Sequence, residues 1–294
     1  MDLTMPALPV LAGVLRVLSV VAMFMAAGGA LFLTLKTRGL PDLARRIQPG
    51  LLYLAAVAGV TAVLGLGPHG AVLNGRGLSA LLGFDAWWTG FASDRGLAVS
   101  LLLLGLGPLA LGIAGLGRGV AAAGTVLGAL VAVGSMAADS VAAYADPRWV
   151  STSAIILHGY GTALWLGGLW PLVVALTTQS DEAAAALVRR FLKTAIGAWA
   201  LLLASGLLLS PVALAEPGAL VGTGYGRTWM LKLALALGLL ALAAVRTAHL
   251  WPQLMAHRPG AAVALRSAVF TQAALGFSLV LVSLALDIAP VLES

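Results

Sequence analysis

The chain has 294 residues, of which 61% are hydrophobic and 10% are charged, and it contains no cysteine. Soluble domains are about half apolar and about a quarter charged, so this composition excludes an ordinary soluble enzyme, a disordered chain and a disulfide-stabilised domain. The formal net charge of +6 does not indicate nucleic-acid binding, because the 17 Lys and Arg residues are scattered among long apolar runs. We therefore expect an all-α integral membrane protein.

Eight runs of the sequence are long and apolar enough to cross ~30 Å of hydrocarbon as helices. The first run has no basic leader and is followed by Lys36 and Arg38, so we interpret it as a retained span and not as a signal peptide. The sequence predicts a single transmembrane domain over residues 1–294, with four helices in 1–149 and four in 150–294. The runs are residues 9–35, 51–66, 96–116, 119–144, 150–178, 186–209, 228–250 and 262–289.

The basic residues predict the orientation of these spans. Eleven of the 17 Lys and Arg residues lie after odd-numbered helices, and the positive-inside rule assigns that side to the cytoplasm. We therefore expect both termini in the periplasm and a multi-pass protein of the bacterial inner membrane. The eleven residues are Lys36, Arg38, Arg45, Arg46, Arg118, Arg189, Arg190, Lys193, Arg246, Arg258 and Arg266.

The longest connection, residues 68–95, lies on the predicted periplasmic side. It contains Trp87 and Trp88 close to Leu81, Leu82 and Phe84. We favour an interfacial helix held at the lipid headgroups by tryptophan, because aromatic side chains concentrate there. A lid over a substrate entrance is the alternative.

Three motifs follow one another in the second half of the chain. From Leu157 the sequence reads LHGYGTALWLGGLWPL, then RRFLKTAIGAWALLLASGLLLSP, then GTGYGRTWMLKLALALGLLALAAVRTAHLWP. Their order resembles the CopD (PcoD-type) copper resistance protein D family over about residues 150–290. The residues that carry the resemblance are His158, Trp165, Gly167, Gly168, Arg190, Phe191, Ser205, Gly206, Tyr225, Gly226, Arg227, Lys232, Arg246 and Pro252.

Two positions depart from the pattern of this family. Ser135 and Met136 stand where the family often has a Gly-His-Ala element, and Gln272 stands where the last helix often carries an acidic residue. The resemblance implies an inner-membrane protein that moves copper from periplasm to cytoplasm or hands it to a partner. It also implies a periplasmic copper carrier of the CopC type as partner, beside membrane lipid, and leaves the oligomeric state open.

The best candidate metal site combines His158, Met136 and Asp139. Met136 and His158 each lie eleven residues from Pro147, at the turn between the fourth and fifth helices. At ~1.5 Å per residue both lie about 16 Å below that turn. A thioether and an imidazole suit Cu(I), and a nearby carboxylate also allows Cu(II). We therefore expect the three side chains to converge on one copper ion.

Other residues are candidates for completing this coordination. Met5, Met23 and Met25 lie in or near the first helix, and His69 lies in the long outside connection, where the alternative is a solvated histidine. His158 itself has an alternative role, since an intramembrane histidine also serves as packing glue by hydrogen bonding to Ser, Thr or a carbonyl. Burial of an ionisable residue in a membrane is costly and favours the functional interpretation.

Five further residues are assigned structural or gating roles. Trp165 lies on the same helix face as the candidate histidine and forms either a wall of the site or ordinary packing. Lys232 and Asp287 lie at comparable depth, so we expect a salt bridge between them. The alternative is a lysine that extends to the membrane surface and an aspartate in water. Tyr225 and Arg227 are expected to form a helix entry and an interfacial anchor.

We do not expect an enzyme or catalytic residues. The sequence shows no His-Glu-x-x-His motif, no nucleotide-binding glycine motif and no carboxylate pair within a span. Two alternatives to copper transport stay open. One is a membrane haem, redox or oxidase-assembly factor that uses His158 and Met136 as axial ligands. The other is a non-transporting receptor for a periplasmic copper chaperone.

Overall fold

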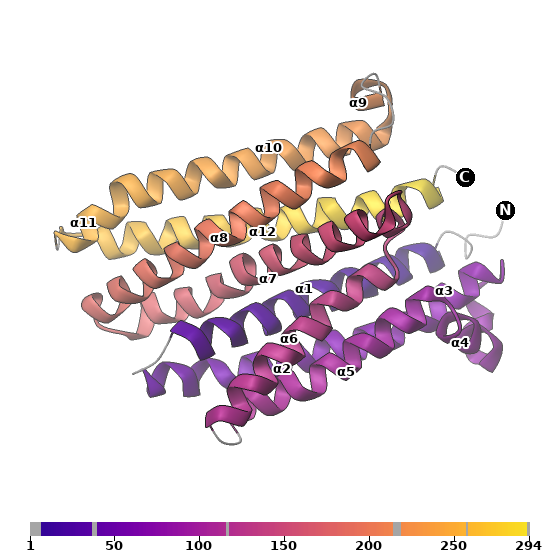
Figure 1. Ribbon diagram of the computed structural model, residues 1–294, viewed down its shortest axis with the longest axis horizontal. Coiled ribbons are helices and arrows are strands. Elements are labelled where there is room, and N and C mark those ends of the chain that lie inside the picture. Colours follow the sequence, from indigo (N-terminus) through magenta and orange to yellow (C-terminus); the bar gives the residue numbers. More distant parts are fainter. Residues whose placement is uncertain (1–6, 37–39, 116–117, 214–218, 257, 293–294) are drawn as a thin grey trace.

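The computed structural model describes residues 7–36, 40–115, 118–213, 219–256 and 258–292. The described residues form helices joined by short connections, and they include no strand. Eight helical segments among them are long and apolar enough to cross a membrane. The helices run side by side in one elongated bundle (Figure 1). The predicted fold class and the predicted number of spans are confirmed.

The helices of the first half differ in length from the prediction. The second span is longer, because α2 continues through Gly65 into α3 and the two together cover residues 41–73. The α-helix of the fourth span, α6, is shorter than predicted, because it ends at Gly134 and is followed by two 3₁₀ turns. The elements are α1 (Ala7–Lys36), α2 (Pro41–Leu64), α3 (Leu66–Leu73), η1 (Leu78–Leu82), α4 (Phe84–Phe91), α5 (Asp94–Ala114), α6 (Arg118–Gly134), η2 (Ser135–Ala138) and η3 (Val141–Tyr144).

The long connection between the second and third spans is mostly helical. In α4, Trp88 lies between Phe84 and Phe91, with ring centroids 6.1 and 5.9 Å apart, and all three side chains are exposed. Trp87 points the other way and donates a hydrogen bond to the Leu81 carbonyl at 3.0 Å. The expected helix is therefore present, while its position at the lipid headgroups and a lid function stay predictions.

The second half contains one irregular span. In it, α10, the π-helical turn η4 and α11 follow one another without a break. Arg246 begins the π turn and is 2% exposed, so the prediction that it lies in a cytoplasmic connection is wrong. The elements are α7 (Arg148–Thr178), α8 (Asp181–Ala213), α9 (Ala219–Gly222), α10 (Gly224–Val245), η4 (Arg246–Leu250), α11 (Trp251–Met255) and α12 (Ala261–Leu292).

The two halves meet where α1 packs against α7, in the middle of the bundle (Figure 1). A Cβ added at Gly28 would lie 1.7 Å from the Ala163 carbonyl oxygen, and one at Gly167 would lie 2.5 Å from the Phe24 oxygen. Small residues let membrane helices approach this closely, and packing is the main force that holds them together. These two glycines therefore fix how the first half sits against the second.

The start of α1 and the end of α12 lie at the same end of the bundle, close to α3, α4 and α9 (Figure 1). The α11 segment lies at the opposite end. Eight spans require both ends of the chain's helical part to lie on one side, as the arrangement shows. That this side is the periplasm stays a prediction from the basic residues.

Candidate functional site

A small cavity lies between α1, α2, α5 and η2, at the end of the bundle where α1 begins. Its volume is about 50 Å³. Three charged side chains line it together with two hydroxyl groups and two thioethers. The lining residues are Arg16, Ser19, Val20, Met23, Ala62, Arg95, Ala98, Val99, Leu102, Ser135, Met136 and Asp139.

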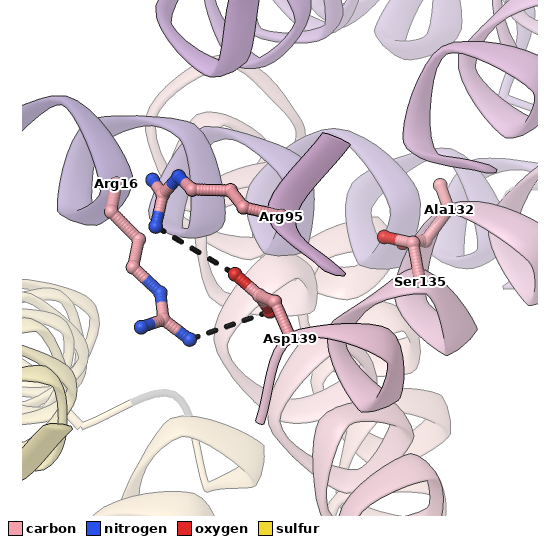
Figure 2. Close-up of polar contacts among 5 residues, drawn as sticks. All are labelled: Arg16, Arg95, Ala132, Ser135 and Asp139. Carbon is pink, nitrogen blue, oxygen red and sulfur yellow. Dashed lines mark hydrogen bonds and ion pairs between the residues drawn. The ribbon is translucent and has the colours of Figure 1, made fainter. Parts of the chain in front are cut away.

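The charged residues form a triad in which one carboxylate faces two guanidinium groups (Figure 2). Arg16 from α1 lies 3.4 Å from Asp139, and Arg95 from α5 lies 3.6 Å from it. The three side chains are 20%, 9% and 15% exposed in the order Arg16, Arg95, Asp139. Charged groups inside a span are costly unless they pair, so this triad links three segments of the first half.

The end of α6 explains how Asp139 reaches this position. The Ser135 hydroxyl donates a hydrogen bond to the Ala132 carbonyl at 2.7 Å (Figure 2). The backbone changes from α to 3₁₀ at that residue and leaves helical geometry at Asp139. Because a 3₁₀ turn has 3.0 residues per turn and not 3.6, the change rotates the following side chains relative to a continued α-helix. Asp139 consequently faces α1 and α5.

A second polar contact fastens the start of α5 just outside the span. The Tyr144 hydroxyl donates a hydrogen bond to the Asp94 carboxylate at 2.6 Å. This bond, with a smaller contribution from desolvation, raises the pKa of Tyr144 above its ordinary value. The Arg148 guanidinium lies over the Tyr144 ring at 4.8 Å from its centroid. These contacts hold η3 and the beginning of α7 against the helix that carries Arg95.

Met136 and Met23 supply the cavity's two sulfur atoms, and Met23 is almost fully buried. The Met136 sulfur also packs on α7, where a Cβ added at Gly159 would lie 3.5 Å from it. Met136 therefore lies at the depth of His158, as predicted, because Gly159 is the next residue of the same helix. Met25 is partly buried and packs against the hydrophobic core, and it does not line the cavity.

His158 faces a different helix from the one predicted. Its Nδ1 lies 3.0 Å from the Ser205 hydroxyl of α8, and it does not line the cavity. Successive helix residues point about 100° apart, so His158 turns toward α8 while its neighbour Gly159 faces Met136. The structure thus brings Met136 and Asp139 together in one cavity and leaves His158 beside it. The convergence of all three side chains on one copper ion stays a prediction.

The contacts of Ser205 determine which nitrogen of His158 carries a proton. Ser205 donates its single hydroxyl proton to the Leu201 carbonyl at 2.5 Å, so it accepts from His158. Nδ1 is then the protonated nitrogen, and Nε2 keeps its lone pair. A neutral imidazole with a free Nε2 is the form that binds a metal ion, and the hydrogen bond at the other nitrogen fixes the ring's orientation.

Trp165 is 2% exposed and packs edge-to-face on Trp199 of α8, with ring centroids 5.2 Å apart. The indole N–H groups of both residues are buried without a hydrogen-bond partner in the described part of the chain. Trp165 also fills the space beside Gly276 of α12. It is a packing residue of the α7, α8 and α12 contact, and it does not line the cavity.

Six predicted residues lie away from the cavity or wholly or partly outside the described set. His69 lies in α3 and not in a loop, and it interacts electrostatically with the triad Arg16, Arg95 and Asp139. Lys232 is partly buried in α10 within electrostatic range of His158, and Arg227 is exposed near the start of α10. Met5 lies outside the described residues. The side chains of Asp287 and Tyr225 are also outside the described set, so the salt bridge predicted for Lys232 stays a prediction.

Sequence reasoning missed two of the three charged residues at the cavity. The sequence places Arg16 just inside a helix end and Arg95 at the end of the outside connection, where long basic side chains ordinarily extend to the membrane surface. Both instead turn inward to Asp139. Arg16 lies inside the predicted first span, and a charged residue within a span indicates a partner. Arg95 directly precedes the predicted third span and gave no such signal.

A second missed polar contact lies within the other half. Arg246 donates a hydrogen bond to the Gln272 side-chain oxygen at 2.5 Å and lies over the Phe191 ring, 5.7 Å from its centroid. Gln272 is fully buried, and its amide nitrogen has no partner among the described residues. A π turn begins at Arg246, and such turns often mark functional positions in helices.

Comparison with known families agrees with the motifs of the second half. Residues 185–286 match the CopD family model. The description of that model is copper resistance protein D, and the match covers most of α8 through most of α12. It lies inside residues 150–290, where the motifs predict the resemblance. No curated protein and no solved structure gives a significant match to the chain.

The CopD match associates a multi-pass membrane protein with copper. The cavity and its charged triad lie outside the matched segment, whereas Ser205 lies within it. Among the residues that the structure describes, no group of three or more His, Asp or Glu side chains is placed to hold a metal ion. The cavity itself offers the thioethers of Met23 and Met136, which are ligands that Cu(I) accepts.

Proposed function

We propose that this protein is a bacterial inner-membrane copper carrier that takes Cu(I) from the periplasmic side and passes it inward or to a partner. The observation that carries the proposal is the CopD match together with a cavity lined by two thioethers, beside the helix that carries His158, whose Nδ1 is hydrogen-bonded to Ser205. Thioether and neutral imidazole ligands are soft enough to favour Cu(I) over Cu(II) and Zn.

In this proposal Met23 and Met136 make the first contact, with Asp139 at the edge of the same cavity. His158 receives the ion next, since Met136 packs on α7 one residue away from it. A periplasmic carrier of the CopC type is the proposed source of the copper.

The geometry gives less support to a haem protein with His158 and Met136 as axial ligands. Axial ligands must face each other across the haem iron, whereas Met136 contacts α7 beside Gly159 and the His158 ring hydrogen bonds to α8. A receptor without transport activity differs from the proposed carrier in one property, which is movement of copper across a bilayer.

The proposal is tested by the metal content of detergent-purified protein after loading with Cu(I) and, separately, with Zn. We expect copper in a fixed ratio to wild-type protein and its loss in His158→Ala. The matched control is His249→Ala, which removes an exposed histidine of η4. Equal copper in the wild type and His158→Ala, or none in either, contradicts the proposed role of His158.

A second pair of variants tests the inferred orientation of the imidazole. Ser205→Ala leaves the ligand in place but removes the acceptor of its Nδ1 proton. Partners of this kind typically change metal affinity by about 10–100-fold. We expect copper affinity to fall by roughly that factor, while Ser210→Ala, one helix turn further along α8, leaves it unchanged. Unchanged affinity in Ser205→Ala contradicts the inferred tautomer.

A further inference from the structure

Arg95 is buried without enough partners for its charge. Its side chain is 9% exposed, and its Nε has no hydrogen-bond partner. Its Nη1 lies 3.6 Å from the Asp139 Oδ2. An N–H···O hydrogen bond is shorter, roughly 2.7–3.2 Å between donor and acceptor. A guanidinium has five N–H donors, and leaving such donors unsatisfied in a low-dielectric site is costly.

The carboxylate beside Arg95 does not resolve this deficit. Asp139 divides one negative charge between two guanidinium groups and is too far from Arg95 for a strong hydrogen bond. The two hydroxyl groups of the cavity donate to backbone carbonyls, Ser19 to Ala58 and Ser135 to Ala132, and neither accepts a hydrogen bond from the Arg95 Nε. Arg95 lines the cavity, and its Nε lacks an acceptor among the described residues.

The cavity in front of Arg95 limits the size of that acceptor. Its volume is about 50 Å³, and one water-sized group requires roughly 10–15 Å³ on this measure. The cavity therefore holds about three to five water-sized groups, enough for a halide ion or a carboxylate of very few atoms.

We propose that the cavity binds a small monovalent anion, a halide or a small carboxylate, through the guanidinium of Arg95. The anion supplies the acceptor that Arg95 lacks and adds a negative charge beside the triad. Binding at this position requires no copper and stands independently of the proposed carrier function. Chloride and formate are the two probes, because they share the charge and differ in being an inorganic ion or a carboxylate.

The test measures thermal unfolding of copper-free protein by tryptophan fluorescence, starting in sodium gluconate, whose anion exceeds the cavity. Gluconate is replaced stepwise by chloride or by formate at constant ionic strength. A ligand that binds only the folded state raises the melting temperature in a saturable way. We expect this rise in the wild type with at least one probe, and the more effective probe identifies the class of anion.

Variants of Arg95 and of Asp139 are expected to change anion binding in opposite directions. A purely structural role of Arg95 does not predict this difference. Arg95→Gln abolishes the rise, while the control Arg46→Gln, at an exposed position of α2, keeps it. Asp139→Asn removes the competing carboxylate, and Coulomb attraction at this distance predicts anion binding at least about tenfold tighter. If Arg95→Gln fails to fold, Arg95→Lys replaces it, with weaker anion binding as the expected result.

Three results overturn the proposal. The first is a wild type that melts alike in gluconate, chloride and formate. The second is a saturable rise that persists unchanged in Arg95→Gln or Arg95→Lys. The third is weaker or unchanged anion binding in Asp139→Asn.

Discussion

Replacing Gly28 by alanine tests whether the α1 to α7 contact holds the two halves together. The added Cβ would lie 1.7 Å from the Ala163 carbonyl oxygen and 2.5 Å from its carbon, whereas real Cβ atoms stay beyond 3.0 Å of such atoms. Both obstacles are backbone atoms, so no side-chain rotation relieves the clash. The helices must move apart by about 1.3 Å or more at the point of closest approach.

The expected loss of stability follows from this displacement. Overpacking a well-packed contact costs about 1–3 kcal/mol, and a clash with backbone lies at the upper end of that range. For a chain of this size each kcal/mol shifts the melting temperature by roughly 2–4 °C. We therefore expect Gly28→Ala to lower the melting temperature by about 6 °C or more.

The matched control is Gly197→Ala, the same substitution in α8 at a position with no heavy atom within 4 Å of the added Cβ. Alanine is the better helix former by about 1 kcal/mol, so this variant is expected to melt at or slightly above the wild-type temperature. The assay is thermal unfolding in detergent, followed by tryptophan fluorescence. If Gly28→Ala melts like Gly197→Ala, the close helix crossing is not the contact that joins the halves.

Two further predictions concern polar contacts outside the cavity. Gln272→Glu is expected to raise the melting temperature, because it places a carboxylate beside buried Arg246 and removes the unpartnered amide nitrogen. Gln272→Leu is expected to lower the free energy of unfolding by about 2 kcal/mol, because it leaves Arg246 without that acceptor. Equal melting temperatures of the two variants contradict this reasoning. The titration of Tyr144 is followed by tyrosinate absorbance, as the part of the signal that Tyr144→Phe removes. We expect its midpoint to lie above the ordinary tyrosine pKa and to fall in Asp94→Asn. The stabilisation from this hydrogen bond is complete below the ordinary tyrosine pKa and is lost as the pH rises through the raised pKa of Tyr144. An unchanged titration midpoint in Asp94→Asn contradicts the hydrogen bond as the cause of the raised pKa.

Hydropathy was sufficient to predict the helical class and the eight spans, because a membrane requires each segment to satisfy its own backbone hydrogen bonds. Counting residues from Pro147 was also sufficient for depth, since Met136 does pack against α7 beside His158. Both predictions depend on distance along an axis, which changes little when a helix is locally irregular.

The direction in which each side chain points was not predictable in the same way. A continued α-helix through Tyr144 would have kept Asp139 in a register set by Met136, but the 3₁₀ turn at Ser135 rotates it toward α1 and α5. The partner of His158 depended on how α8 lies against α7, which no periodicity of a single helix contains. Arg95 was missed because basic residues at the ends of spans ordinarily face water.

Uptake of Cu(I) into proteoliposomes measures whether the protein moves copper across a bilayer, as we propose. The comparison uses the wild type, the double variant Met23→Leu with Met136→Leu, and the control Met230→Leu at an exposed position of α10. Leucine conserves volume and removes the sulfur ligand. The account predicts uptake by the wild type and the control and its loss in the double variant. Absence of uptake by the wild type, or equal uptake by all three proteins, contradicts it.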